Sequence, residues 1–406
     1  MNAPWPEVPL KAIICELEAG VIVHSLNQPV CGNTEIGVLK VSCVTSGRFL
    51  PEENKKVIPK DESRAAVSPR AGDVIISRAN TFDLVGTCGY VTEDHPNLFL
   101  SDKLWRVQLC DAQTDSRRWL VALLSSTRLR REFRRRATGT SGSMKNISKE
   151  SLLAIPVPRP PRELQRVLGA MFGQFETTCQ LLDQAIAAQR TFKRGLRQQL
   201  LSGHRRFFRF SRSKWNTVAL GDVVRPVPRK VRKPVEAFLS AGVRSHGKGV
   251  FLKEDFPANG IALEELFVLR QLDLVVNITF GWEGAIAIVP PEADGALVSH
   301  RFPTYEFDQT KALPEYFRHV IRTRRFVFDV ACASPGGAGR NRVLNRREFL
   351  EIPLKLPSIE EQARIADLLN GVDCEIDLLE RLQHQIELYK RALLNCLLSG
   401  EIPIPA

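Results

Sequence analysis

The feature that most constrains the fold is a long segment that occurs twice in the chain. Residues 155–203 align with residues 352–400 without a gap, and both copies end in Leu-Leu-Ser-Gly. A repeat of this length indicates a duplicated structural unit and is considered before any local pattern. The sequence therefore predicts two halves of similar architecture, each closed by the same element.

Each copy of this repeat has the pattern of one long helix. Apolar residues recur at alternating spacings of four and three, which is typical of helices that pack side by side. Prolines stand near the start of each copy, and a glycine follows the last expected helical position. The alternative, two unrelated core helices, is disfavoured because the copies share their length and both ends. The positions expected at helix or partner contacts are Glu163, Gln165, Leu168, Phe175, Leu182 and Leu196 in the first copy and Glu361, Gln362, Ile365, Val372, Leu379 and Leu393 in the second.

Length and composition indicate an ordinary globular protein. The chain has 406 residues, enough for two or three domains, and is 44% hydrophobic and 25% charged. It has no apolar run approaching about 18 residues and no signal-peptide pattern, so we expect a cytoplasmic protein. Nine cysteines are scattered without a C-x-x-C pair, and the seven histidines lack ligand spacing. We therefore expect a reducing compartment and no metal site.

The charge favours a polyanionic partner. Lysine and arginine outnumber aspartate and glutamate by 57 to 45, which gives a net charge of +12. Such an excess suits nucleic acid or an anionic membrane surface. A basic amphipathic anchor is not evident, so nucleic acid is the expected partner and a membrane is not.

The similarity of the halves extends beyond the long helices. Each half opens with W-x-x-V-x-L, at Trp5 and at Trp215. Short β-like segments follow at 37–44, 72–79 and 104–109 in the first half and at 272–280, 285–289 and 302–307 in the second. A helical segment (116–135 or 314–330) and a loop rich in glycine and serine or alanine (137–146 or 333–342) then lead into the repeat. The chain is therefore predicted to be α+β, in the order globule, helix, globule, helix.

Catalytic motifs are not apparent in the sequence. The segment 242–249, GVRSHGKG, resembles a phosphate-binding loop but has Gly249 where that motif needs serine or threonine, so we interpret it as a turn between strands. A dinucleotide fingerprint, a zinc constellation, a nucleophile elbow and an amino-methyltransferase tetrapeptide are all missing. We therefore predict neither catalytic residues nor a bound cofactor.

Basic clusters are the strongest candidates for a binding site. They precede a Gly-rich loop at equivalent places in both halves, and a further cluster follows residue 229. Arginine forks, hydroxyl groups and free backbone amides are typical phosphate contacts, whereas a solvated helix face is the alternative. The linker 204–214 mixes arginine with phenylalanine; we expect its phenylalanines to pack on a neighbouring domain rather than to stack on bases. The predicted DNA-binding residues are Arg78, Asn80, Arg130, Arg131, Arg134, Arg135, Arg136, Thr138, Ser141, Ser143, Lys145, Arg229, Lys230, Arg232, Lys233, Arg244, Lys248, Asn277, Arg340 and Arg342.

Taken together, these features resemble the specificity subunits of bacterial type I restriction–modification enzymes. The resemblance rests on two copies of I-P-x-x-x-P-x-x-E-x-Q that open a long helix ending in L-L-S-G, on GDVIISRA (72–79), on residues 273–307 and on the repeated W-x-x-V-x-L. It covers essentially the whole chain. One departure is Leu164, which separates Glu163 from Gln165 where the second copy has adjacent Glu361 and Gln362.

The resemblance implies an architecture and a role. It implies two α/β target recognition domains (1–154 and 204–351) separated by two long antiparallel coiled-coil helices (155–203 and 352–406), related by an internal pseudo-twofold duplication. Such a subunit is non-catalytic: it reads a bipartite double-stranded DNA site. It directs to that site two adenine-N6 methyltransferase subunits, which use S-adenosylmethionine, and motor–nuclease subunits, which use ATP and Mg²⁺. The alternatives are an autonomous architectural DNA-binding protein with a coiled-coil spacer, and an enzyme whose catalytic residues escape notice.

Overall fold

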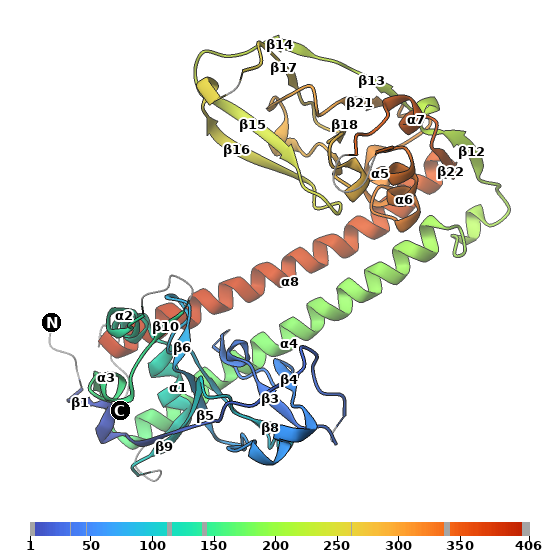
Figure 1. The fold of residues 1–406 in the computed structure, drawn as a ribbon. Helices are drawn as coiled ribbons and strands as arrows, with labels where there is room; N and C mark the ends of the chain where they lie inside the picture. Colours follow the sequence, from blue (N-terminus) through green and yellow to red (C-terminus); the bar gives the residue numbers. More distant parts are fainter. Residues whose placement is uncertain are drawn as a thin grey trace. The chain divides into compact units, whose positions relative to one another are not determined.

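The computed structural model describes residues 5–32, 34–45, 47–111, 116–139, 144–260, 262–336 and 342–399 (Figure 1). The chain combines helices and strands, as an α+β fold requires. Its contacts divide it into two compact units: unit 1 is Met1–Ala185 with Leu379–Ala406, and unit 2 is Ile186–Leu378. Each unit therefore contains one globular part together with portions of both long helices.

Unit 1 is built on a four-stranded antiparallel sheet. Its spatial order is β2 (Ile14–Ala19), β9 (Leu104–Leu109), β5 (Val74–Ser77) and β7 (Cys88–Tyr90). A smaller sheet has the order β4 (Asn54–Lys56), β3 (Gly37–Leu39) and β8 (Leu98–Phe99). Two ribbons complete the unit: β1 (Glu7–Pro9) with β11 (Pro156–Pro158), and β6 (Ala79–Asn80) with β10 (Lys145–Asn146).

The helices of unit 1 cover the four-stranded sheet and close its core. They are α1 (Arg117–Ser125), α2 (Thr127–Arg136) and α3 (Lys149–Leu153), with short 3-10 turns at Leu10–Ala12, Val41–Val44 and Pro59–Arg64. Trp105 and Trp119 are buried in one apolar cluster that also includes Leu168 and Leu397 from the two long helices. The ends of these helices are thus part of the core of unit 1.

Unit 2 is built on a four-stranded antiparallel sheet with the same order of equivalent strands. That order is β13 (Val224–Pro226), β21 (Thr304–Phe307), β18 (Leu274–Val276) and β19 (Ile286–Ile288). A second sheet has the order β14 (Lys230–Arg232), β17 (Glu265–Val268), β20 (Leu297–Val298), β15 (Phe238–Val243) and β16 (Val250–Phe256). A ribbon pairs β12 (Asn216–Ala219) with β22 (Pro353–Leu356).

The three short helices described in unit 2 occur in the same order along the chain as those of unit 1. They are α5 (Pro314–Val320), α6 (Arg324–Cys332) and α7 (Arg346–Leu350), with 3-10 turns at Phe208–Phe210, Leu220–Asp222, Ala258–Gly260, Gly281–Glu283 and Pro291–Ala293. Backbone contacts recur as well. Leu10 N donates to Ile155 O at 2.9 Å, and Leu220 N donates to Ile352 O at 2.9 Å. Each W-x-x-V-x-L segment therefore pairs with the strand that precedes a long helix.

Two predicted helical segments are each divided in two. Segment 116–135 breaks at Ser126, and segment 314–330 breaks at Thr323. The hydroxyl of Ser126 accepts from Leu129 N, and that of Thr323 accepts from Phe326 N, both at 3.3 Å. A serine or threonine hydroxyl that caps a new helix competes with continuation of the previous one. The strands are also shorter than predicted; the segment 37–44, for example, is a strand only over Gly37–Leu39.

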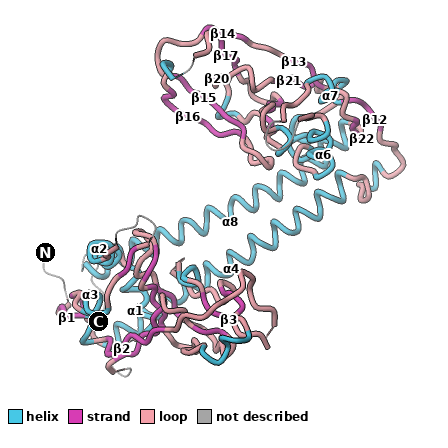
Figure 2. The backbone as a smooth tube through the Cα atoms, viewed as in Figure 1, coloured by secondary structure: helices cyan, strands magenta, loops and turns pink. Residues whose placement is uncertain are grey.

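The two long helices are α4 (Arg162–Leu201) and α8 (Ile359–Ser399), which Figure 2 shows in cyan. Within each unit, the start of one helix lies beside the end of the other, antiparallel. In unit 1, Lys390 Nζ lies 3.4 Å from Glu176 Oε1, and in unit 2 Lys193 pairs with Asp373. These two ion pairs occupy equivalent positions of the repeat. None of the described helices is apolar enough over a sufficient length to cross a membrane.

Candidate nucleic-acid interface

The basic cluster of unit 1 lies on α2 and is only partly available to a ligand. Arg130 is half-buried and donates to Val85 O at 2.8 Å and to Asp83 O at 2.5 Å; its burial lowers the pKa of the guanidinium. Arg134 lies 3.5 Å from the Asp83 carboxylate. These two arginines therefore hold the segment 81–86 against α2.

The end of α2 offers more exposed positive charge. Arg135 and Arg136 share the Glu132 carboxylate at 2.9 and 3.2 Å, and the hydrogen bond from Arg135 lowers the pKa of Glu132. Arg131 is exposed. Because one carboxylate serves two arginines, this end of the helix keeps an excess of positive charge that suits phosphate.

The loop after α2 is held to β6 and β10. Thr138 Oγ1 donates to Asn146 O at 3.4 Å, and Lys145 Nζ donates to Gly139 O at 2.6 Å. Asn80 pairs with Lys145 across the ribbon, while the Arg78 guanidinium lies 6.0 Å from the centroid of a Trp105 ring. The predicted residues Ser141, Ser143 and Arg340 lie outside the described residues.

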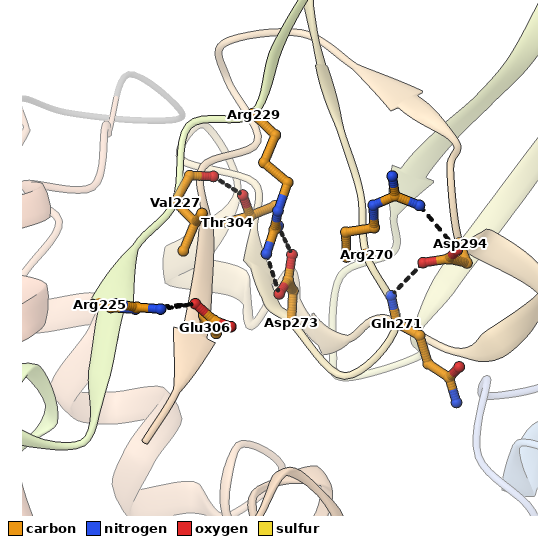
Figure 3. A network of polar contacts seen from close by, with 9 residues as sticks. All are labelled: Arg225, Val227, Arg229, Arg270, Gln271, Asp273, Asp294, Thr304 and Glu306. Carbon is orange, nitrogen blue, oxygen red and sulfur yellow. Dashed lines mark hydrogen bonds and ion pairs between the residues drawn. The ribbon is translucent and has the colours of Figure 1, made fainter. Parts of the chain in front are cut away.

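In the cluster that starts at residue 229, Arg229 itself has a structural role. Arg229 forms an ion pair with Asp273, which is 4% exposed, and this pair belongs to a network that also joins Arg225 to Glu306 (Figure 3). Burial raises the pKa of Asp273, and Arg229 opposes that shift. A half-buried arginine that is paired with a buried carboxylate supports the β-sheet and has little capacity left for phosphate.

Other members of that cluster remain at the surface. Lys230 pairs with Glu265 at 2.9 Å, whereas Arg232 and Lys248 are exposed. Arg244 is exposed and its guanidinium lies 5.2 Å from the centroid of the Phe251 ring. Lys233 donates through its backbone to Glu264 O at 2.8 Å.

The segment 242–249 forms the turn between β15 and β16, as predicted. Its left-handed residues are His246, Gly247 and Gly249, with φ values of 62°, 64° and 85°. Next to the turn the two strands pair directly, Val243 with Val250 and Gly242 with Phe251. The linker differs in part from its prediction: Phe207 packs against the core of unit 2 and Phe210 is buried, but Phe208 is 96% exposed.

One pair of equivalent loops was not predicted from the sequence. Residues 81–86 and 279–284 share the pattern Thr-Phe-x-x-x-Gly and lie between equivalent strands of the four-stranded sheets, β5 and β7 in unit 1 (directly after β6) and β18 and β19 in unit 2. Gly86 and Gly284 are left-handed, with φ values of 75° and 74°. The signal that could have found these loops is the six-residue pattern itself, which occurs once in each half. Arg342 belongs to this region of unit 2, since its guanidinium lies 5.5 Å from the Trp282 ring centroid.

The predicted contact positions of the long helices are mostly covered. Gln165, Glu361 and Gln362 are buried, and Glu163 is exposed beside Arg166. The apolar positions are all buried or half-buried: Leu168, Phe175, Leu182, Leu196, Ile365, Val372, Leu379 and Leu393. Across the described part of the chain, no cluster of three or more histidine, cysteine, aspartate or glutamate residues is arranged to hold a metal ion.

Comparison with known proteins gives a consistent result. No family model matches the chain. The EcoEI specificity subunit of Escherichia coli is 26% identical over 46% of this chain and 32% of its own length. The MjaVIII specificity subunit of Methanocaldococcus jannaschii is 23% identical over 70% of each chain. The chain thus spans about a third of the length of the first of these type I restriction enzyme subunits and 70% of the second.

Solved structures show the same fold. The crystal structure of a type I restriction–modification S subunit from M. genitalium has a TM-score of 0.61 at 14% identity and covers 100% of this chain and 98% of its own. A chain from a study of complex assembly and conformational transition in a type I system has a TM-score of 0.53 at 15% identity and covers 99% and 100%. The resemblance predicted from the sequence is confirmed: the curated relatives are named specificity subunits, and a solved structure of similar fold is an S subunit.

Proposed function

We propose that this homologue of type I specificity subunits reads a bipartite DNA site and brings modification and restriction subunits to it. Residues 1–154 and 204–351 are the two recognition domains, one for each half of the site. Residues 155–203 and 352–406 are the spacer helices of an antiparallel coiled coil. The chain itself is non-catalytic, and the chemistry belongs to its partners.

The observation that carries this proposal is the recurrence of one junction in both units. Gln165 Nε2 donates to Pro160 O at 2.9 Å while its Oε1 accepts from Ser116 N at 3.0 Å. Gln362 makes the same contacts with Pro357 O and Leu313 N, both at 3.0 Å. A protein that presents one scaffold twice suits a DNA site with two separately read halves.

Two partner-docking surfaces follow from the same repeat. Leu181 and Leu378 are 60% and 58% exposed and occupy equivalent positions of α4 and α8, as do the exposed Phe192 and Tyr389. Large exposed apolar side chains at matched positions favour two copies of one partner over a single asymmetric one. That partner is the adenine-N6 methyltransferase subunit, which supplies S-adenosylmethionine binding; the motor–nuclease subunits supply ATP and Mg²⁺ chemistry.

The surface charge suits the DNA itself. Among the predicted contacts, Arg131, Arg232, Arg244 and Lys248 are exposed on the two units. Exposed cations of this kind contact phosphates and position a protein on the duplex without reading its sequence.

One experiment tests the proposal as a whole. The chain is co-expressed with the modification subunit of its host, the complex is weighed by native mass spectrometry, and methylated adenines are mapped genome-wide. We expect two modification subunits per chain and methylation at a motif with two defined halves and an unread gap. Methylation by the chain alone would show an enzyme, and DNA binding without a methyltransferase partner would show an autonomous architectural protein.

A second part of the experiment tests what sets the length of the unread gap between the half-sites. Inserting one heptad after Ala185 and one after Leu378 keeps the pairing of Asp183 with Gln383 in unit 1 and of Lys193 with Asp373 in unit 2. It also preserves the apolar seam and lengthens each helix by about 10 Å. We expect unchanged half-sites and a gap longer by roughly three base pairs. Insertion in α4 alone is the control, which should disrupt helix pairing.

A further inference from the structure

We propose that Phe82 and Phe280 are equivalent base-contacting residues, one for each half of the DNA site. This inference rests on the proposed function, because it assigns a role within the recognition surface. Both residues follow the threonine of the Thr-Phe-x-x-x-Gly loops at 81–86 and 279–284. They are 49% and 39% exposed, so a large apolar ring stands at the surface at the same place in both units.

Both loops begin near an asparagine that bonds the threonine backbone, although Asn80 directly precedes Thr81 and Asn277 stands two residues before Thr279. The Asn80 side-chain oxygen accepts from Thr81 N at 2.8 Å, and that of Asn277 accepts from Thr279 N at 3.1 Å. Such short-range bonds fix the turn that leads into the phenylalanine. These two asparagines were predicted DNA contacts; the structure gives their oxygens the role of holding the loop.

The loops also end in the same way. A Cβ added to Gly86 would lie 2.6 Å from Phe133 of α2, and Gly284 lies against Val327 of α6. Both glycines adopt a left-handed backbone that other residues rarely accept. Each loop is therefore seated on the equivalent helix of its unit, with its phenylalanine left at the surface.

Different contacts in each unit hold the loops rigid. In unit 1 the Arg130 guanidinium bonds Val85 O and Asp83 O. In unit 2 Trp282 Nε1 donates to Thr279 O at 3.2 Å, and His246 N donates to Glu283 O at 2.8 Å. A rigid loop loses little conformational entropy when it binds, which favours a recognition role.

The electrostatics around both rings favour DNA. The acidic side chains of the loops are engaged: Asp83 lies near Arg134, and Glu283 accepts from Ser245 Oγ at 2.8 Å. Guanidinium groups are close, with Arg301 donating to Thr279 Oγ1 at 3.2 Å. An exposed apolar ring in a loop that is also contacted by guanidinium groups matches a base edge, such as a thymine methyl group, or an unstacked base step between phosphates.

A scattered apolar residue on the surface needs no special role. Here the exposed ring recurs in two loops whose remaining residues differ, in company with the same threonine, the same left-handed glycine and the same helix contact. Loop residues that are exposed, apolar and held in place by their neighbours are typical of binding sites. The recurrence therefore favours a shared ligand contact.

The test uses selection from a random duplex library with the full chain, in complex with its modification subunit. Phe82→Ala should relax one half of the selected motif and Phe280→Ala the other, each with about a tenfold loss of affinity for the selected duplex. The salt dependence of binding should stay unchanged, because no phosphate contact is removed. Phe82→Tyr and Phe280→Tyr keep an aromatic ring and should restore most of the affinity.

Phe208→Ala is the matched control, since it removes an exposed phenylalanine outside these loops. Thermal unfolding of every variant checks that the fold is retained. If Phe82→Ala and Phe280→Ala select the wild-type motif with the affinity of the control, the inference is overturned and the proposed function stands. If the wild-type complex selects no two-part motif, the proposed function itself fails and this inference fails with it.

Discussion

In each unit the start of a long helix, α4 or α8, packs against the rest of the unit at an equivalent junction. The residues at these two junctions differ. In unit 1 the start of α4 carries Leu164, which packs on the core, and Gly169 and Gly173, which lie against α1. In unit 2 the start of α8 presents Glu361, Ala366 and Asn370 at the same positions of the repeat. One scaffold thus tolerates an apolar, small-residue contact in one copy and a polar contact in the other.

In unit 1 the two glycines allow α4 to lie close to α1. A Cβ added to Gly173 would lie 2.6 Å from the Arg118 guanidinium, and one added to Gly169 would lie 3.0 Å from Trp119 N. Unit 2 instead uses polar side chains. His319 Nε2 lies 2.9 Å from Asn370 Oδ1, and Glu361 binds Arg206 and the Trp215 indole. The shared glutamine contacts therefore define the junction, while the surrounding residues determine how its stability responds to mutation and pH.

The largest expected effect comes from the buried charge of unit 2. Glu361 is fully buried, and its carboxylate lies 2.6 Å from the Arg206 guanidinium. Glu361→Ala leaves that arginine without its partner, so the free energy of unfolding should fall by about 3–5 kcal/mol. Glu361→Leu combined with Arg206→Met copies the apolar character of unit 1 and should recover most of the loss. Denaturant unfolding measures both; a double variant no more stable than Glu361→Ala would contradict the equivalence.

The second effect is a pH dependence confined to unit 2. Burial lowers the pKa of His319 to about 4, with Lys193 and Arg322 acting in the same direction and Asp373 opposing them. The unfolded histidine, with a pKa near 6.5, binds a proton first as the pH falls. Stability should therefore decrease between about pH 6.5 and pH 4, by up to about 3 kcal/mol.

The control for this pH effect is His319→Gln, which keeps a donor for Asn370 and cannot titrate. The difference in unfolding free energy between wild type and variant should shrink or change sign as the pH falls through that window. In unit 1 the equivalent residue is Ala122, so hydrogen exchange of α1 should not follow the same curve. An identical pH profile for His319→Gln and wild type would rule out this assignment.

A third effect should be equal in the two units. Gln165→Ala and Gln362→Ala each remove a buried side chain that bonds backbone groups at the start of a long helix. Each loss should cost about 1–3 kcal/mol, because buried backbone groups are left without a partner. Hydrogen exchange read by mass spectrometry locates the effect, in α4 for the first variant and α8 for the second. A change confined to one unit would show that the junctions are equivalent only in geometry.

The smallest expected effect concerns the two equivalent ion pairs between the long helices, one in each unit. Lys390→Met and Lys193→Met remove the bonds to Glu176 and Asp373. Partly exposed pairs contribute little, so each change should alter stability by less than about 1 kcal/mol. Lys193 is the more buried of the two, and burial lowers its pKa, so its replacement should be the more nearly neutral. Thermal unfolding at low and high salt measures the difference.

Local patterns predicted the long helices and the α+β character well, because heptad spacing and terminal prolines and glycines act within a few residues. The break at Ser126 was missed, since a serine within an apolar run can either continue a helix or cap the next one. Arg229 was predicted to contact DNA, but Asp273, which pairs with it, lies 44 positions away in the chain. Charge pairing of this kind depends on the tertiary fold and leaves no local signal.

The division of the chain into units has a consequence for its biosynthesis. Unit 1 needs Leu394, Leu397 and Leu398, which pack in one cluster with Leu10 and Ile13 from the other end of the chain. The ribosome makes all of unit 2 between these segments, which takes on the order of tens of seconds at roughly 5–20 residues per second. During that interval the first half exposes the apolar surface that the end of α8 later covers. The nascent chain should therefore depend on chaperone binding near residues 1–185 until the end of α8 has been synthesised.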